Sequence, residues 1–94
     1  MYKVFTKPNC PYCTRAKELL EQLNIPYETY HLGENMTGGD GHYTVTIDQM
    51  FEMIGKQVRS MPQIMKDDKL IGGYTDLREY FINEGKINFE GEKL

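Results

Sequence analysis

The sequence predicts an α/β domain in which three helices cover the two faces of a four-stranded mixed β-sheet. Segments with strand-like and helix-like periodicity alternate along the chain in the order βαβ, α, ββ, α. An opening βαβ unit favours two parallel strands joined by a right-handed crossover. A closing hairpin would add two antiparallel strands to the same sheet. Between the first strand and the first helix stand Cys10 and Cys13, the only two cysteines.

The first half of the chain contains the predicted βαβ unit. Residues 2–6 form a short β-prone run, which Pro8 ends. Residues 27–32 alternate apolar and polar side chains, as expected of a half-buried second strand. Between them, a segment beginning at Pro11 has apolar side chains at the spacing of one helix face: Ala16, Leu19, Leu20 and Leu23.

The middle of the chain combines a glycine-rich segment with a second helix. Residues 33–41 contain four glycines among Asn, Asp and Thr, so we interpret the segment up to about residue 43 as a mobile loop. Thr46 and Gln49 have capping-box spacing, which predicts a helix from there to Gly55. Its apolar face consists of Ile47, Met50, Phe51 and Ile54.

The last third of the chain predicts a hairpin and a third helix. Residues 63–66 and 69–71 are two short apolar runs separated by two aspartates, as in a β-hairpin. Asp76 with Glu79 indicates a helix start, and the helix is expected to end at Gly85. We therefore predict one domain over residues 1–94. Its core covers about 1–84, and the tail 85–94 either frays or packs back.

Composition excludes several classes of function. The net charge is −3 and the eleven Lys and Arg residues are scattered, so we expect no nucleic-acid binding. No window approaches the ~20 apolar residues of a membrane span, which predicts a soluble, cytoplasmic protein. We also expect a monomer. Two cysteines in a reducing compartment are seldom a structural disulfide, so metal binding or redox chemistry is favoured.

The spacing of the cysteines favours redox chemistry. Pro11 suits the first helical position, which makes Cys10 the N-cap and Cys13 the third helical residue. Helix N–H groups, the helix dipole and a nearby Lys7 would lower the pKa of the Cys10 thiol. Cys10 is therefore the expected nucleophile, and the less accessible Cys13 the resolving thiol of a redox-active disulfide.

Metal binding is the alternative. Zinc usually takes four ligands, and only His31 and His42 are available to complete a set. These two histidines lie in or beside the glycine-rich segment, and we expect both to be exposed side chains without a ligand role. No metal is expected.

Three blocks of the sequence resemble the glutaredoxins, which belong to the thioredoxin-fold superfamily. The blocks are residues 6–13 (TKPNCPYC), 59–62 (RSMP) and 72–77 (GGYTDL), and their order and spacing extend over residues 1–84. The resemblance implies a thioredoxin fold and a glutathione-dependent thiol–disulfide oxidoreductase. Its nucleophile would be Cys10, and glutathione would be the reductant.

The resemblance also implies a glutathione site. Met61, before a cis Pro62, would pair its backbone with the cysteinyl part of glutathione. Thr75 through its N–H and Asp76 through its side chain would bind the γ-glutamyl end. The family positions that hold the glycyl carboxylate match Lys7, Gln49 and Arg59. Tyr12 would form one wall of the site.

Each of these assignments has a structural alternative. Asp76 would also serve as a helix cap, Gln49 as part of the capping box, and Lys7 and Arg59 as solvated charges. The sequence departs from the family pattern at Met61, where valine is usual, and at Tyr74, where cysteine is usual. The glycine-rich segment is also longer than in compact glutaredoxins.

The leading hypothesis is an enzyme that reduces protein disulfides and glutathione mixed disulfides. Because short glutaredoxins often serve ribonucleotide reductase, the resemblance implies this enzyme as a partner. One alternative is a thioredoxin-like reductant recharged by a flavoprotein reductase. Another is a non-enzymatic dimer that holds a [2Fe–2S] cluster through Cys10 and glutathione.

Overall fold

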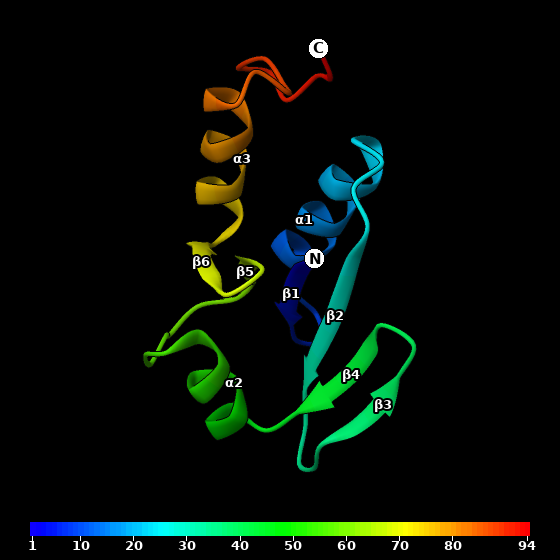
Figure 1. Ribbon diagram of the computed structural model, residues 1–94, viewed down its shortest axis with the longest axis vertical. Helices are drawn as coiled ribbons and strands as arrows, with labels where there is room; N and C mark the ends of the chain where they lie inside the picture. The colour runs from blue at the N-terminus through cyan, green and yellow to red at the C-terminus, as the bar shows by residue number, and fades with distance from the viewer.

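The computed structural model describes residues 1–94 as one mixed sheet with three helices (Figure 1). In chain order the elements are β1 (Tyr2–Thr6), α1 (Pro11–Gln22), β2 (Tyr27–Leu32), β3 (Thr37–Gly39), β4 (His42–Val45), α2 (Ile47–Ile54), β5 (Gln63–Lys66), β6 (Lys69–Gly72) and α3 (Tyr74–Asn83). The strand order is β3-β4-β2-β1-β5-β6. The expected pairs are confirmed: β1 is parallel to β2, and β5 and β6 form an antiparallel hairpin.

The sheet has six strands instead of four because the interpretation of residues 33–41 as a mobile loop is wrong. This segment contains β3, and an Asp40-Gly41 turn leads into β4, which lies parallel to β2. Both turn residues have positive φ, the conformation that tight hairpin turns require. Gly38 also has a positive φ, of 106°, and a Cβ there would overlap the carbonyl of His42. The glycines therefore permit the hairpin's close backbone packing.

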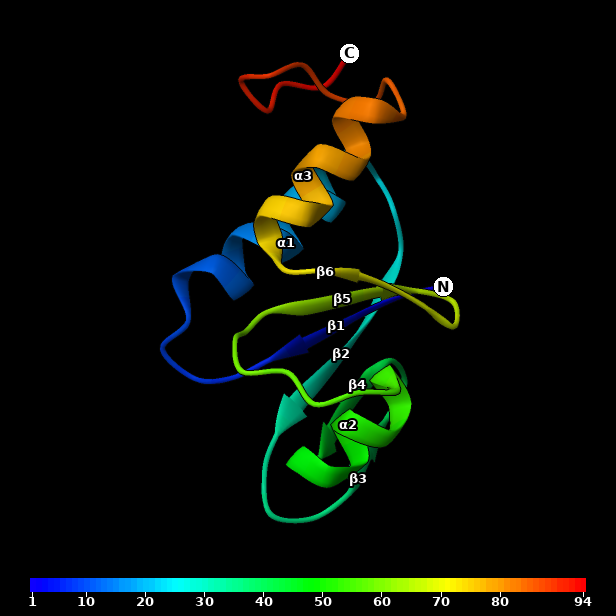
Figure 2. The ribbon, with the colours of Figure 1, turned by 90° about the vertical axis from the view of Figure 1, so that its left-hand side faces the viewer.

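Helices cover both faces of the sheet, as Figure 2 shows: α1 and α3 lie on one face and α2 on the other. Successive side chains of β1 point to opposite faces of the sheet, so β1 contributes to both hydrophobic cores. Val4 packs in the core beneath α1 and α3, and Phe5 packs in the core beneath α2. On the α2 side, the Tyr30 ring stacks between Phe5, at 5.1 Å, and Tyr43 of β4, at 4.9 Å. The added hairpin is thereby anchored in the core.

The third helix starts three residues earlier than expected. Gly73 is its N-cap, and Asp76 is the third helical residue, not the start of the helix. The tail after this helix packs back instead of fraying: Ile87 is buried in the α1–α3 core, and the Asn88 side chain accepts the backbone N–H of Glu92. None of the three helices has the length and apolar character needed to cross a bilayer.

Candidate active site

The two cysteines form a disulfide at the N-terminus of α1. Cys10 is the N-cap, with extended backbone angles, and Pro11 is the first helical residue, as predicted from the spacing. The backbone N–H of Cys13 donates to the Cys10 sulfur across 3.2 Å. Cys13 is 1% exposed, whereas Cys10 is only partly buried. An incoming sulfur therefore reaches Cys10 first.

The segment before β5 faces this disulfide. The Met61-Pro62 peptide bond is cis, as the resemblance implied. The sulfur of Cys10 lies 3.8 Å from the carbonyl oxygen of Met61. The backbone N–H of Met61 has no acceptor within the chain, so it is free to bind a ligand beside the reactive sulfur.

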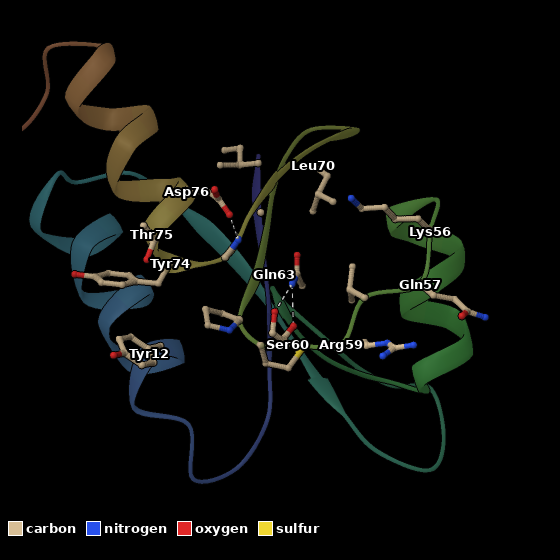
Figure 3. A pocket seen from close by; sticks show the side chains of 16 residues that line it. Tyr12, Lys56, Gln57, Arg59, Ser60, Gln63, Leu70, Tyr74, Thr75 and Asp76 are labelled. Carbon is tan, nitrogen blue, oxygen red and sulfur yellow. Dashed lines mark hydrogen bonds between the residues drawn. The ribbon is translucent and has the colours of Figure 1, made fainter.

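A pocket of about 670 Å³ extends from this segment between the start of α3 and the end of α2 (Figure 3). Tyr12 forms one wall, and its ring packs 5.8 Å from that of Tyr74. Lys56 and Arg59 supply positive charge at the far end, near the end of α2 (Figure 3). The pocket thus combines aromatic walls with a cationic end.

The start of α3 provides hydrogen-bond donors at the other end of the pocket. Thr75 and Asp76 lie in the first turn, where backbone N–H groups have no partner inside the helix. One oxygen of the Asp76 carboxylate accepts the N–H of Gly73 at 3.0 Å. A Cβ at Gly72 would overlap this carboxylate, so glycine is required there. Helix N–H groups of this kind favour a bound carboxylate.

A second hollow, of about 490 Å³, also touches both cysteines. It shares no lining residue with the first pocket, and its lining includes the cations Lys7 and Lys17 together with His31. The pKa of His31 is lowered, chiefly by burial and further by the positive charges of Lys17 and His42. No group of three His, Cys, Asp or Glu side chains is arranged to hold a metal ion.

Comparisons with known proteins agree with this geometry. The family model described as Glutaredoxin matches residues 3–71. The chain is 36% identical over 77 residues to Glutaredoxin 1 of Salmonella typhimurium, covering 82% of this chain and 85% of that protein. This chain belongs to the glutaredoxin family. It is a glutathione-dependent thiol–disulfide oxidoreductase.

Other glutaredoxins support the same assignment. The Haemophilus influenzae glutaredoxin is 37% identical over 73 residues, covering 78% of this chain and 80% of that protein. The structure of reduced Escherichia coli glutaredoxin superposes with a TM-score of 0.64 at 31% identity. The alignment covers 88% of this chain and 93% of that one. The fold is therefore that of the glutaredoxins.

The structure of this glutaredoxin gathers most of the predicted site residues into the first pocket. Six of the predicted residues line it: Tyr12, Arg59, Met61, Pro62, Thr75 and Asp76. Lys56, which the sequence analysis did not single out, lines it as well. The only feature of the sequence that could have pointed to Lys56 is its position directly after Gly55, the C-cap of α2. This position lies outside the three sequence blocks that resemble the glutaredoxins.

Two of the predicted glutathione-binding residues lie outside the first pocket. Lys7 lines the second hollow. Gln49 closes the capping box of α2: its side chain accepts the Thr46 N–H at 2.9 Å, and its own N–H donates to the Thr46 hydroxyl at 3.1 Å. Its amide also donates to the sulfur of Met36 at 3.4 Å. The Gln49 side chain is therefore committed to local structure.

Proposed function

We propose that this glutaredoxin reduces protein disulfides and glutathione mixed disulfides, with Cys10 as the nucleophile and Cys13 as the resolving thiol. The observation that carries this assignment is the unequal placement of the two sulfurs. Cys10 is partly exposed and receives the Cys13 N–H, whereas Cys13 is buried beneath it. A helix N-terminus stabilises negative charge, so the accessible sulfur is also the one favoured as thiolate.

The reduced enzyme reduces a substrate disulfide in two successive thiol–disulfide exchanges. The Cys10 thiolate attacks one sulfur of the substrate disulfide, and the other sulfur leaves as a thiolate that takes up a proton. Cys13 then loses its proton and attacks the Cys10 sulfur, which releases the second substrate thiol. The substrate gains two electrons, and the enzyme ends as the Cys10–Cys13 disulfide.

Glutathione supplies the electrons that restore the dithiol, because two glutathione thiols become one disulfide. The chemistry of the first pocket fits this tripeptide. The free N–H of Met61 is suited to pair with its cysteinyl backbone, and the start of α3 with the carboxylate of its γ-glutamyl end. Arg59 and Lys56 at the opposite end supply positive charge for the glycyl carboxylate.

The proposed setting is a cytoplasmic, monomeric, single-domain enzyme that acts on disulfide-containing proteins. Ribonucleotide reductase is one candidate substrate, on the strength of the family resemblance alone. No metal is required for the steps above, since each is an exchange between sulfur atoms.

The test is glutathione-coupled reduction of a small glutathione mixed disulfide, followed through glutathione reductase and NADPH. We expect Cys10→Ser to be inactive. Cys13→Ser is expected to keep activity, because a mixed disulfide at Cys10 needs only glutathione to resolve it. Turnover that is independent of glutathione would contradict the proposal and favour the thioredoxin-like alternative. A brown dimer after anaerobic purification would instead favour the cluster-binding one.

A further inference from the structure

The chain between α2 and β5 makes up nearly half of the first pocket. Seven of the 16 lining residues belong to it: Lys56, Gln57, Val58, Arg59, Ser60, Met61 and Pro62. We name these seven residues the pocket segment. The segment carries the free N–H of Met61, so its position relative to Cys10 determines where a ligand lies beside the reactive sulfur.

Few hydrogen bonds hold the pocket segment in place. It belongs to no helix or strand, and none of its backbone groups forms a backbone–backbone hydrogen bond. Val58 and Met61 pack against the hydrophobic core beneath α2. Apolar packing has no preferred direction, so it does not fix the orientation of the peptide groups. The orientation of the segment therefore depends on hydrogen bonds from side chains.

Gln63, the first residue of β5, supplies these hydrogen bonds. Its side-chain amide donates to the Ser60 carbonyl at 2.8 Å and to the Ser60 hydroxyl at 3.4 Å, as the dashed lines in Figure 3 show. No other group of the chain donates to the Ser60 carbonyl. The two hydrogen bonds thus connect the residues on either side of Met61 and Pro62.

The Gln63 side chain is itself held by the sheet. Gln63 is 6% exposed, and it pairs with Phe5 of β1, the strand that leads to Cys10. A buried carbonyl or amide that loses its partner costs more free energy than the hydrogen bond contributes when it is made. The amide of Gln63 therefore ties the pocket segment to the pair of strands that also positions Cys10.

We propose that Gln63 is a positioning residue for glutathione binding: its amide holds Ser60 so that the N–H of Met61 faces the ligand beside Cys10. The inference rests on the proposed function, because it concerns the N–H that we assign there to the cysteinyl part of glutathione. Gln63 takes no part in the sulfur exchanges. The role requires a donor, because an ionised carboxylate of the same shape has no hydrogen to offer to a carbonyl.

The first test compares Gln63→Met with Ser60→Ala in the glutathione-coupled assay with the small glutathione mixed disulfide. Methionine is similar to glutamine in length but has no donor, so the Ser60 carbonyl loses its partner. We expect KM for the mixed disulfide to rise about fivefold. The value of kcat should stay within about twofold, because the lost interaction serves the bound substrate and the transition state alike.

Ser60→Ala is the matched control. It removes only the 3.4 Å contact with the hydroxyl and leaves the 2.8 Å hydrogen bond to the backbone carbonyl intact. Both kcat and KM should therefore stay within about twofold of their original values.

Gln63→Glu makes the same contact switchable within one folded protein. A protonated carboxyl donates to the Ser60 carbonyl, whereas the ionised form repels it. The titration of the introduced carboxyl is followed by carbon NMR, and KM is measured well below and well above its midpoint. Each value is divided by the KM of the unaltered enzyme at the same pH, which removes the contributions of the charged groups that both proteins share: Cys10, Lys56, Arg59 and Asp76. The ratio should be near one below the midpoint and approach that of Gln63→Met above it.

Two results would overturn the inference. One is a KM for Gln63→Met that rises no more than the KM for Ser60→Ala. The other is a KM ratio for Gln63→Glu that does not change as the introduced carboxyl ionises, and this comparison decides alone if Gln63→Met does not fold. The unaltered enzyme separates this failure from failure of the proposed function. If it is inactive with the glutathione mixed disulfide, the proposed function itself fails, whereas an active enzyme that is indifferent to Gln63 loses only the positioning role.

Discussion

The sulfur of Cys10 lies 3.8 Å from the carbonyl oxygen of Met61, although the two residues are 51 positions apart in the chain. The fold achieves this approach because β1, which leads to Cys10, pairs directly with β5, which follows Pro62. The reactive sulfur and the free N–H of Met61 are thus held by adjacent strands of one sheet. A ligand paired with the N–H of Met61 would therefore lie beside the Cys10 sulfur.

The reduced enzyme is expected to react with alkylating agents at Cys10 well before Cys13. Cys10 is partly exposed at the positive end of α1, whereas Cys13 is 1% exposed. Brief treatment with iodoacetamide at pH 6, followed by mass spectrometry, should show modification of Cys10 at least about tenfold faster. Similar rates at the two residues would contradict the assignment of the nucleophile.

Asp76 caps α3, and Asn and Ala substitutions should separate this role from its proposed role in binding glutathione. Asp76→Ala removes the acceptor for the Gly73 N–H and should destabilise the protein by about 1 kcal/mol. Asp76→Asn keeps an acceptor, so the free energy of unfolding should change little. If the carboxylate binds the ammonium group of glutathione, Asp76→Asn should still raise KM for glutathione several-fold. An unchanged KM in Asp76→Asn would leave Asp76 only a capping role.

Gln49 should affect stability and not glutathione binding. Its side chain closes the capping box of α2 and lies outside the first pocket, where we propose that glutathione binds. Gln49→Ala is expected to lower the free energy of unfolding by about 1 kcal/mol in denaturant titrations. KM for glutathione should stay within twofold of its original value. Arg59→Gln is the contrasting variant, since Arg59 lines the pocket and its loss should raise KM. A large rise in KM for Gln49→Ala would contradict this division.

The β3–β4 hairpin offers two adjacent glycines with opposite expected tolerance. Gly38→Ala places a Cβ against the His42 carbonyl at a positive φ and should cost at least about 1 kcal/mol of stability. Gly39→Ala meets open space and should change stability by less than about 0.5 kcal/mol. Thermal or denaturant unfolding of the two variants checks this. Equal effects would show that the hairpin does not depend on the close approach at Gly38.

His31 should make the protein less stable in mild acid. Its folded pKa lies below the ordinary value of 6.5, so the unfolded chain takes up the proton first as pH falls. Stability should be unaffected by His31 above pH 6.5 and should decrease as pH falls from 6.5 through the folded pKa. Denaturant unfolding at pH 7.5 and pH 5 should show a smaller loss in His31→Asn than in the unaltered protein. An identical loss would contradict the shift.

Local sequence patterns correctly predicted where α1 and α2 begin. Pro11 after Cys10 placed the N-cap and the first helical residue, and the Thr46–Gln49 capping box placed the start of α2. The cis Met61-Pro62 bond was not predictable from composition or spacing, because most bonds before proline are trans. It followed from the family resemblance alone.

The glycine-rich segment and the division into two hollows were not predictable. Glycines at 33–41 lack the alternating side chains by which a strand is recognised, and their pairing with β4 depends on positive φ angles that only tertiary contacts select. The family resemblance matches both Lys7 and Arg59 to the glycyl carboxylate of glutathione. Only the packed structure shows that they line different hollows.

The β3–β4 hairpin changes which strand lies at the open edge of the sheet. Without it, the residues of β2 that pair with β4, Thr29–Leu32, would form an open sheet edge, a ready template for pairing with another chain. The hairpin covers β2 with β4 and leaves β3 outermost, with only three residues, two of them glycines and one at a positive φ. So short and irregular an edge disfavours intermolecular strand pairing, and we therefore expect the β3–β4 hairpin to reduce aggregation through this side of the sheet.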